Sequence, residues 1–201
     1  MNIEELVDKL TKNRILLVYG EAGTGKTTLG LMLTIRFLKE NKKVLFLDTE
    51  NSFSIERFQQ IAGHDFKILL DNILVLKVKH FKDQQEKINS LQNLINHFKP
   101  SLIIFDSISP YYRRLIKHDK NLANSMLNSQ LRAIKNTNIP SIIVSQVYSD
   151  LNNNIKPLGY NTLANYTNNF IELKKEPRTM ILFPEKNRIN FEILNDGIKL
   201  N

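Results

Sequence analysis

The segment Gly20–Thr27, with the sequence GEAGTGKT, constrains the fold of this chain more strongly than any other. It fits the pattern G-x-x-x-x-G-K-[ST], in which glycines allow successive backbone N–H groups to turn toward one phosphate. The apolar run Ile15–Tyr19 comes before it, and an apolar helical pattern over Lys26–Lys39 comes after it. A buried strand, this loop and a helix in that order predict an α/β fold with a phosphate-binding loop.

Each residue type in the loop has an expected task. The Lys26 ammonium is expected to bridge the β- and γ-phosphates of ATP, the Thr27 hydroxyl to bind Mg²⁺, and Thr28 to contact the α-phosphate. The remaining nucleotide contacts are expected from Gly20, Glu21, Ala22, Gly23, Thr24 and Gly25. The alternative is a glycine-rich turn without a ligand, and the position of the motif between a strand and a helix argues against it.

Short apolar runs alternate with helical patterns along the rest of the chain. Further strands are expected at 44–47, 73–78, 102–105 and 142–144, and helices at 54–62, 83–98 and 121–136. This alternation predicts an α/β fold with right-handed crossovers and a mostly parallel central sheet that has helices on both faces. Runs at 170–173, 180–183 and 189–193, followed by a turn and a strand at 198–200, predict a C-terminal antiparallel extension.

The length of 201 residues suits a single domain. We expect a short N-terminal helix at 2–11, a core at 14–147 and a C-terminal β meander at 168–200. The chain contains no cysteine, which excludes disulfides and thiolate metal sites. No apolar run approaches the roughly 18 residues that a membrane span needs, and the N-terminus lacks the order of a signal peptide. These features predict a cytoplasmic protein with no membrane partner.

Polar side chains follow several of the expected strands, where ligands bind in open α/β sheets. Asp106 follows the strand at 102–105 and is expected to reach Mg²⁺ through a water molecule. Of Asp48 and Glu50, the latter lies farther from the strand and is the better candidate to polarise an attacking water, unless it is a solvated loop acid. Gln146 is expected to sense the γ-phosphate; the alternative is a satisfied polar strand end.

The chain carries a formal net charge of +8, and much of this excess lies in one stretch. Between positions 110 and 157 there are seven Lys and Arg residues and two Asp residues, a local excess of five positive charges. Such a cluster favours a polyanionic partner such as nucleic acid, although a solvated basic face would have the same composition.

Five segments together resemble the RecA/RadA recombinase superfamily, most closely its short archaeal paralogues, over nearly the whole chain. They are GEAGTGKTT at 20–28, LDTENSFSIERF at 47–58, LIIFDSISPYYR at 102–113, IIVSQVY at 142–148 and FEILNDGIKL at 191–200. The resemblance implies a RecA-like ATPase core. It implies that Glu50 activates water, that Arg57 lies near the adenine, and that Gln146 links the γ-phosphate to a DNA-binding loop.

The same resemblance implies two DNA-contacting loops, at roughly 110–120 and 148–160, which coincide with the basic stretch. The expected DNA-binding residues are Arg113, Arg114, Lys117 and Lys156. Tyr111 and Tyr112 stand beside the two arginines and could either stack on bases or pack against the sheet edge.

Several departures from the superfamily pattern refine the expected function. Thirteen residues precede Arg14, and they contain no Phe-x-x-Ala motif; Asn51 stands where a glycine is usual, and the second loop is short. The resemblance therefore implies a nucleoid-associated accessory protein of homologous recombination and DNA repair that hydrolyses ATP slowly and does not exchange strands. Expected partners are single-stranded or branched DNA, a RadA-type recombinase or junction nuclease, and further copies of the chain.

Other functions remain open at this point. The chain could be a regulatory module that binds ATP as a switch with negligible turnover. A helicase motor or a clock-type signalling ATPase would share the same core. A nucleotide kinase is disfavoured, because the expected meander and the acidic segment at 48–50 are not typical of kinases.

Overall fold

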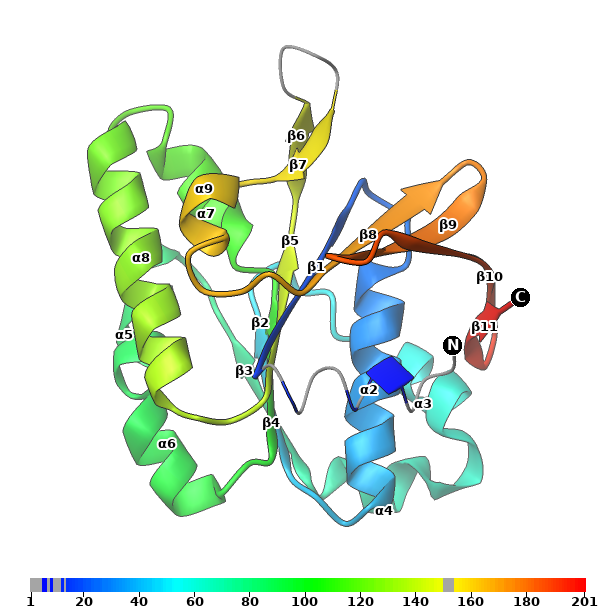
Figure 1. Cartoon of the computed structure of the whole chain (residues 1–201). Helices are drawn as coiled ribbons and strands as arrows, with labels where there is room; N and C mark the ends of the chain where they lie inside the picture. The colour runs from blue at the N-terminus through cyan, green and yellow to red at the C-terminus, as the bar shows by residue number, and fades with distance from the viewer. Residues whose placement is uncertain (1–4, 7, 9–11, 13, 150–153) are drawn as a thin grey trace.

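One nine-stranded sheet organises the computed structural model, which describes residues 5, 6, 8, 12, 14–149 and 154–201 (Figure 1). Its strands are, in spatial order, β11 (Gly197–Leu200), β10 (Asn187–Leu194), β9 (Arg178–Phe183), β8 (Phe170–Lys175), β1 (Ile15–Gly20), β5 (Ser141–Ser145), β4 (Leu102–Asp106), β2 (Val44–Asp48) and β3 (Ile73–Lys77). The strands from β8 to β3 run parallel, and those from β8 to β11 pair antiparallel. This confirms the predicted fold class. The expected helix at 2–11 falls mostly outside the described residues.

Helices cover both faces of the parallel strands (Figure 1). They are α2 (Lys26–Lys39), α3 (Ile55–Ala62), α4 (Phe66–Leu70), α5 (Phe81–Asn89), α6 (Leu91–Phe98), α7 (Ser109–Leu115), α8 (Lys120–Asn136) and α9 (Tyr160–Leu163). Alternate residues of β2 enter two separate cores: Phe46 packs with the α2 side, and Leu45 and Leu47 pack with the α8 side. Since both faces of the central strands are covered, these strands read as continuous apolar runs.

The register of the parallel strands brings their carboxyl ends to one edge of the sheet. Asp48 pairs with Asp106 across β2 and β4, and Tyr19 pairs with Ser145 across β1 and β5. Residues that are far apart in the chain therefore meet beside the loop that follows β1.

Two helical expectations differ from the structure. The single helix expected at 83–98 is divided into α5 and α6 at Ser90, whose φ and ψ are −88° and 2°. The Ser90 hydroxyl donates to the Lys87 carbonyl at 3.0 Å, the kind of local side-chain bond that competes with helical geometry. The segment expected as a loop at 110–120 begins with α7, because Pro110 suits a first helical turn and Tyr111 and Tyr112 bury their rings.

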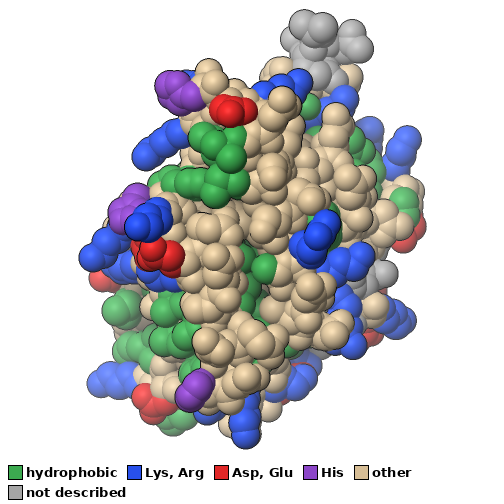
Figure 2. Space-filling model, turned by 90° about the vertical axis from the view of Figure 1, so that its left-hand side faces the viewer, with side chains coloured by type: hydrophobic (Ala, Val, Ile, Leu, Met, Phe, Trp, Pro, Cys, Tyr) green, Lys and Arg blue, Asp and Glu red, His purple; other side chains and the backbone are tan. Residues whose placement is uncertain are grey.

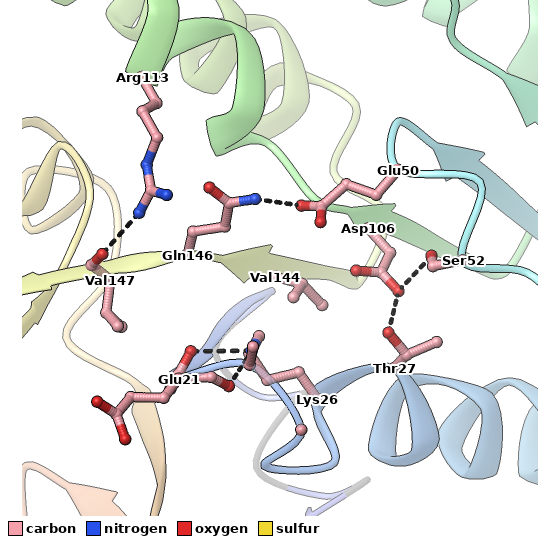
Figure 3. A pocket seen from close by; sticks show the side chains of 13 residues that line it. Glu21, Lys26, Thr27, Glu50, Ser52, Asp106, Arg113, Val144, Gln146 and Val147 are labelled. Carbon is pink, nitrogen blue, oxygen red and sulfur yellow. Dashed lines mark hydrogen bonds between the residues drawn. The ribbon is translucent and has the colours of Figure 1, made fainter.

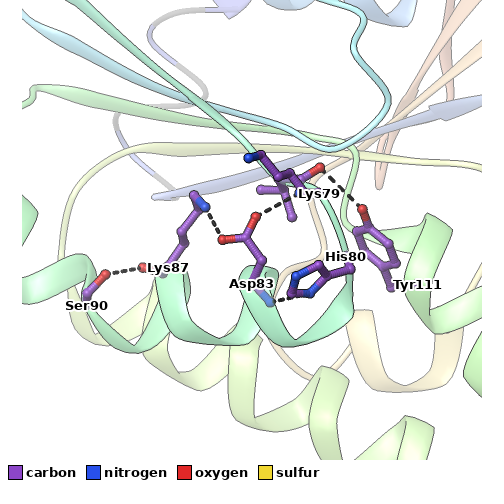
Figure 4. A network of polar contacts seen from close by, with 7 residues as sticks. Lys79, His80, Asp83, Lys87, Ser90 and Tyr111 are labelled. Carbon is purple, nitrogen blue, oxygen red and sulfur yellow. Dashed lines mark hydrogen bonds and ion pairs between the residues drawn. The ribbon is translucent and has the colours of Figure 1, made fainter.

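The start of α5 is held by a polar cap that also reaches α7 (Figure 4). The Asp83 backbone N–H donates to His80 Nδ1 at 3.1 Å, and the Asp83 carboxylate accepts the Lys79 N–H at 2.7 Å. The Tyr111 hydroxyl of α7 donates to the Val78 carbonyl at 3.3 Å. The first two contacts cap α5, and the third holds α7 beside the residue that follows β3.

The second expected loop contains a short hairpin of β6 (Val147–Ser149) and β7 (Ile155–Pro157), which projects beyond β5 (Figure 1). The C-terminal pair β10 and β11 lies instead against α2. A Cβ atom on Gly197 would come within 2.7 Å of Met32 Sδ, which explains a glycine there. No helix in the described part of the chain has the length and apolar composition needed to span a bilayer.

Candidate nucleotide-binding site

A cavity of about 490 Å³ opens at the carboxyl edge of the sheet (Figure 3). The lining comes from the loop after β1 and the start of α2, from the ends of β2, β4 and β5, and from α7. Its residues are Gly20, Glu21, Ala22, Gly23, Lys26, Thr27, Glu50, Ser52, Asp106, Arg113, Val144, Gln146 and Val147. The structure thus brings together the predicted loop, both predicted acids and the predicted glutamine.

The loop is shaped by backbone conformations that favour glycine. Gly23 and Gly25 have φ values of 76° and 98°. A Cβ on Gly20 would lie 2.3 Å from the Leu173 carbonyl oxygen. The helix α2 then begins without a side-chain cap at Gly25. Its first N–H groups have no side-chain partner, and together with the helix dipole they suit a phosphate.

Lys26 lies in the cavity beside this cradle. Its ammonium donates to the carbonyl oxygens of Gly20 at 2.8 Å and Glu21 at 2.6 Å. Burial lowers the pKa of Lys26, and the nearby carboxylates of Asp106, Glu50 and Glu21 oppose that shift. A partly desolvated cation of this kind gains strongly from an anionic ligand.

Three oxygen-bearing side chains converge at the start of α2. The Thr27 hydroxyl donates to Asp106 Oδ2 at 2.7 Å, and the Ser52 hydroxyl donates to the same oxygen at 3.0 Å. Burial raises the pKa of Asp106, while these two hydrogen bonds lower it. Hydroxyl and carboxylate oxygens are ligands that Mg²⁺ accepts. The described residues contain no group of three or more acidic, His or Cys side chains able to hold a metal.

Asp48 and Glu50 occupy different environments. Asp48 is 1% exposed, and its carboxylate accepts backbone N–H groups of Ser52 at 2.9 Å and Phe53 at 3.1 Å. It therefore shapes the turn after β2. Glu50 lines the cavity, and its Oε1 accepts the Gln146 Nε2 at 2.9 Å and the Ser107 hydroxyl. Of the two acids, Glu50 is the one placed to act on a ligand.

The turn after β2 also explains Asn51. Its φ is 55°, in the left-handed region, where asparagine is among the few residues tolerated besides glycine. The Lys77 ammonium donates to its side chain at 2.9 Å. Asn51 thus allows a left-handed turn directly after Glu50, as a glycine would.

Sequence reasoning missed several hydroxyls that hold the strand ends together. The Thr49 hydroxyl donates to the Ser107 carbonyl at 2.6 Å and accepts the Ser107 N–H at 2.9 Å. The Ser109 hydroxyl accepts the Gln146 N–H at 2.8 Å. Their position directly after β2 and β4 was the available signal, since the same rule identified Asp106 and Gln146.

Four predicted nucleotide contacts, Thr24, Gly25, Thr28 and Arg57, are not among the residues that line the cavity. The Thr24 side chain is buried, and its hydroxyl donates to the Glu21 carbonyl at 2.9 Å. The Arg57 guanidinium donates to the Leu194 carbonyl at 2.8 Å and to the Asn195 carbonyl at 2.9 Å, so it anchors the β10–β11 turn. That hairpin packs behind the loop, because Ile193 lies against Gly25. The placement of Arg57 near an adenine stays a prediction.

The predicted DNA-binding residues are dispersed. Arg113 lines the cavity, whereas the Arg114 guanidinium lies 5.6 Å from the Tyr111 ring centroid. Lys117 is exposed, and Lys156 lies 5.8 Å from the Tyr160 ring centroid. Both Tyr111 and Tyr112 are 6% exposed, so they pack rather than offer open faces. The face formed by α5, α6 and α8 shows scattered Lys and Arg rather than one basic patch (Figure 2).

The fold and this cavity define a RecA-like ATPase domain of the P-loop class. The family model described as "ATPase: KaiC" matches residues 2–200. DNA repair and recombination protein RadB of Methanococcus maripaludis is 30% identical over 98% of this chain and 97% of its own length. The protein of that name from Methanosphaera stadtmanae is 32% identical, over 94% of this chain and 88% of its own length. The chain belongs to the RadB family of RecA-like ATPases.

Proposed function

We propose that this single-domain chain binds ATP with Mg²⁺, binds DNA, hydrolyses ATP slowly, and serves recombination and DNA repair as an accessory protein. The observation that carries the proposal is the convergence of Lys26, Thr27, Glu50, Asp106 and Gln146 on one cavity. These residues supply a phosphate cradle, a metal position and a water-facing carboxylate, which are the parts that phosphoryl transfer to water requires.

The chain's own residues have separate tasks in this reaction. The loop amides and Lys26 hold the β- and γ-phosphates, and Thr27 and Asp106 would hold Mg²⁺, which supplies charge neutralisation when bound. Glu50 accepts a proton from water as the water oxygen bonds to the γ-phosphorus. The bond between that phosphorus and the β–γ bridging oxygen breaks, and its electron pair remains on ADP. The products are ADP and inorganic phosphate.

Two hydrogen bonds hold the Glu50 carboxylate in the cavity. Its Oε1 accepts both the Gln146 amide and the Ser107 hydroxyl. A carboxylate has a second oxygen with acceptor sites of its own, so Oε2 is the atom that would take the water proton. Gln146 and Ser107 thus position the base.

The DNA part of the proposal rests on the family and on charge. The similar proteins are named DNA repair and recombination proteins. Three basic residues supply local positive charge that favours a phosphate backbone. Arg114 lies on α7, Lys117 follows α7, and Lys156 lies on β7. On the same basis we propose a nucleoid location, a RadA-type recombinase or junction nuclease as partner, and no strand exchange.

Calorimetry with Mg²⁺ and ATP, followed by phosphate release with and without single-stranded DNA, tests the proposal. The wild-type chain should bind ATP and release phosphate, and Glu50→Gln should lower release by about 10²- to 10⁴-fold, as expected for loss of a general base. Absence of ATP binding at millimolar concentration would refute the nucleotide site.

A second candidate function is an ATP-dependent switch. It is favoured by the hydrogen bond to Glu50 from Gln146, which directly precedes the β6–β7 hairpin and so connects the cavity to that hairpin. In that case wild type and Glu50→Gln would bind ATP equally and release phosphate at the same near-zero rate. The same assay therefore separates the two functions.

A further inference from the structure

Arg113 and Arg114 are neighbours on α7 but lie in different surroundings. The Arg114 guanidinium lies over the Tyr111 ring at 5.6 Å from its centroid. The Arg113 guanidinium reaches away from α7 and donates to the Val147 carbonyl at 2.8 Å, at the start of β6 (Figure 3). Adjacent side chains on a helix point about 100° apart, which explains the divergence.

Arg113 shares the nucleotide cavity with the phosphate loop. Among the described residues that line this cavity, Lys26 and Arg113 are the only cations. They approach from different elements: Lys26 from α2 and Arg113 from α7 (Figure 3). A ligand held by the loop would therefore have a cation on each side.

Gln146 lies between Arg113 and the predicted base (Figure 3). Its Nε2 donates to Glu50, whereas its Oε1 is buried and has no hydrogen-bond partner within the described part of the chain. A buried amide oxygen without a donor is unfavourable, so this part of the cavity is incomplete in its present arrangement. Arg113 carries donors in the same cavity, and they engage a backbone carbonyl that is weaker as a partner than an anion.

We propose that Arg113 is a second phosphate-contacting cation of the nucleotide site, acting within its own chain on the γ-phosphate. The inference rests on the proposed function, because it requires ATP in the cavity. Planar guanidinium donors suit phosphate oxygens, and a cation there stabilises the charge that develops while the γ-phosphate is transferred to water. The release of the Val147 carbonyl by Arg113 also connects the γ-phosphate to the β6–β7 hairpin.

The affinities for ATP and for ADP, each with Mg²⁺, distinguish this role from DNA binding. Arg113→Gln should weaken ATP binding by roughly tenfold, the effect of one charged hydrogen bond, and change ADP affinity by less than about twofold. Arg113→Lys should recover part of the difference, because it keeps the charge but loses the planar donors. Arg132→Gln, an exposed arginine of α8, serves as the charge-matched control and should alter neither affinity.

The same variants are then titrated with single-stranded DNA over a range of salt. Arg114→Gln should reduce the salt slope by about 0.7, the value for one lost phosphate contact. If Arg113→Gln keeps the wild-type ratio of ATP to ADP affinity, the inference is overturned, and a reduced salt slope would assign Arg113 to DNA instead. If the wild-type chain binds neither nucleotide, the proposed function itself fails. A circular dichroism spectrum confirms folding, and Arg113→Lys provides the test if Arg113→Gln does not fold.

Discussion

The two walls of the nucleotide cavity are built in different ways. The loop wall is one contiguous segment, Gly20–Thr27, and it offers mainly backbone N–H groups with glycine conformations. The strand-end wall consists of side chains from β2, β4 and β5, and its Glu50 and Gln146 are 96 positions apart in the chain. The first wall needs only local geometry, whereas the second depends on strand register.

This difference indicates how each wall should respond to mutation. The loop wall would hold the phosphates through a few adjacent groups. A single substitution there should therefore remove nucleotide affinity. The strand-end wall consists of several hydroxyl, amide and carboxylate groups. A single substitution there should therefore change the rate of ATP hydrolysis more than the affinity for ATP. The following experiments test this contrast.

The largest expected effect is on the loop wall. Lys26→Ala should weaken ATP binding by about 100-fold or more, because it removes charged hydrogen bonds to two phosphates. The fold should persist, since Lys26 contacts only loop carbonyls. Calorimetry measures the affinity, and Lys39→Ala, an exposed lysine at the other end of α2, is the matched control. If Lys26→Ala bound ATP with normal affinity, nucleotide binding would not depend on the loop wall as proposed.

A glycine replacement tests the loop backbone itself. Gly25→Ala should destabilise the fold by about 2–3 kcal/mol, from a left-handed φ and crowding against Ile193. Its φ is 98°, and the added Cβ would lie 2.8 Å from Ile193 Cδ1. Gly23→Ala is the control: its φ is 76° with no atom within 4 Å, so the cost should be about 1 kcal/mol. Denaturant unfolding measures both; equal losses would show that crowding contributes nothing.

A smaller effect is expected on the strand-end wall. Ser107→Ala removes one of the two donors to Glu50 Oε1. Phosphate release should fall by about 2- to 10-fold, the equivalent of one ordinary hydrogen bond that positions the base, with ATP affinity unchanged. Ser125→Ala, an exposed serine of α8, should have no effect. A rise in rate would mean that Ser107 restrains Glu50 rather than orienting it.

The smallest effect is expected outside both walls, at Glu172 on β8. Burial raises the pKa of Glu172, and Lys174 and Arg188 oppose the shift. Because the folded-state pKa is raised, the wild-type chain loses stability as the pH rises from the unfolded-state pKa through the folded-state pKa. Glu172→Gln lacks this loss, so it should melt slightly higher at neutral pH, by less than the roughly 2–4 °C that 1 kcal/mol produces. Thermal melts at neutral and acidic pH should converge on acidification; a constant difference would point to packing.

Much of the fold was predictable because its elements have local signals. The apolar runs at β1, β2, β4 and β5 are bounded by polar strand ends, and Ser54 caps α3 as expected by accepting the Arg57 N–H at 3.1 Å. The break at Ser90 and the helix α7 were missed. In both cases the outcome depended on tertiary contacts, since periodicity continues through Ser90 and α7 is stabilised by burial of Tyr111 and Tyr112.

The candidate nucleotide site was likewise predictable where a local sequence signal existed and not where tertiary contacts decided the outcome. The position of each polar residue after its strand was enough to predict that Asp106, Glu50 and Gln146 approach the loop. Nothing in that pattern separates Arg113 from Arg114, because both follow the same two tyrosines. Their different directions arise from α7, which the sequence pattern did not predict.

The sequence by itself determined the phosphate cradle. The spaced glycines before Lys26 and Thr27 specify the backbone path of this loop, because they allow φ values that other residues rarely adopt. The order of residues after β2 also favoured Glu50 over Asp48 as the carboxylate that faces the cavity, but tertiary structure alone decided which groups hold each carboxylate in place. The acids Asp48 and Glu50 are two positions apart and chemically alike, yet one accepts backbone N–H groups and the other meets Gln146. The physical reason is that hydrogen-bond partners from distant strands become available only when the sheet has assembled in register.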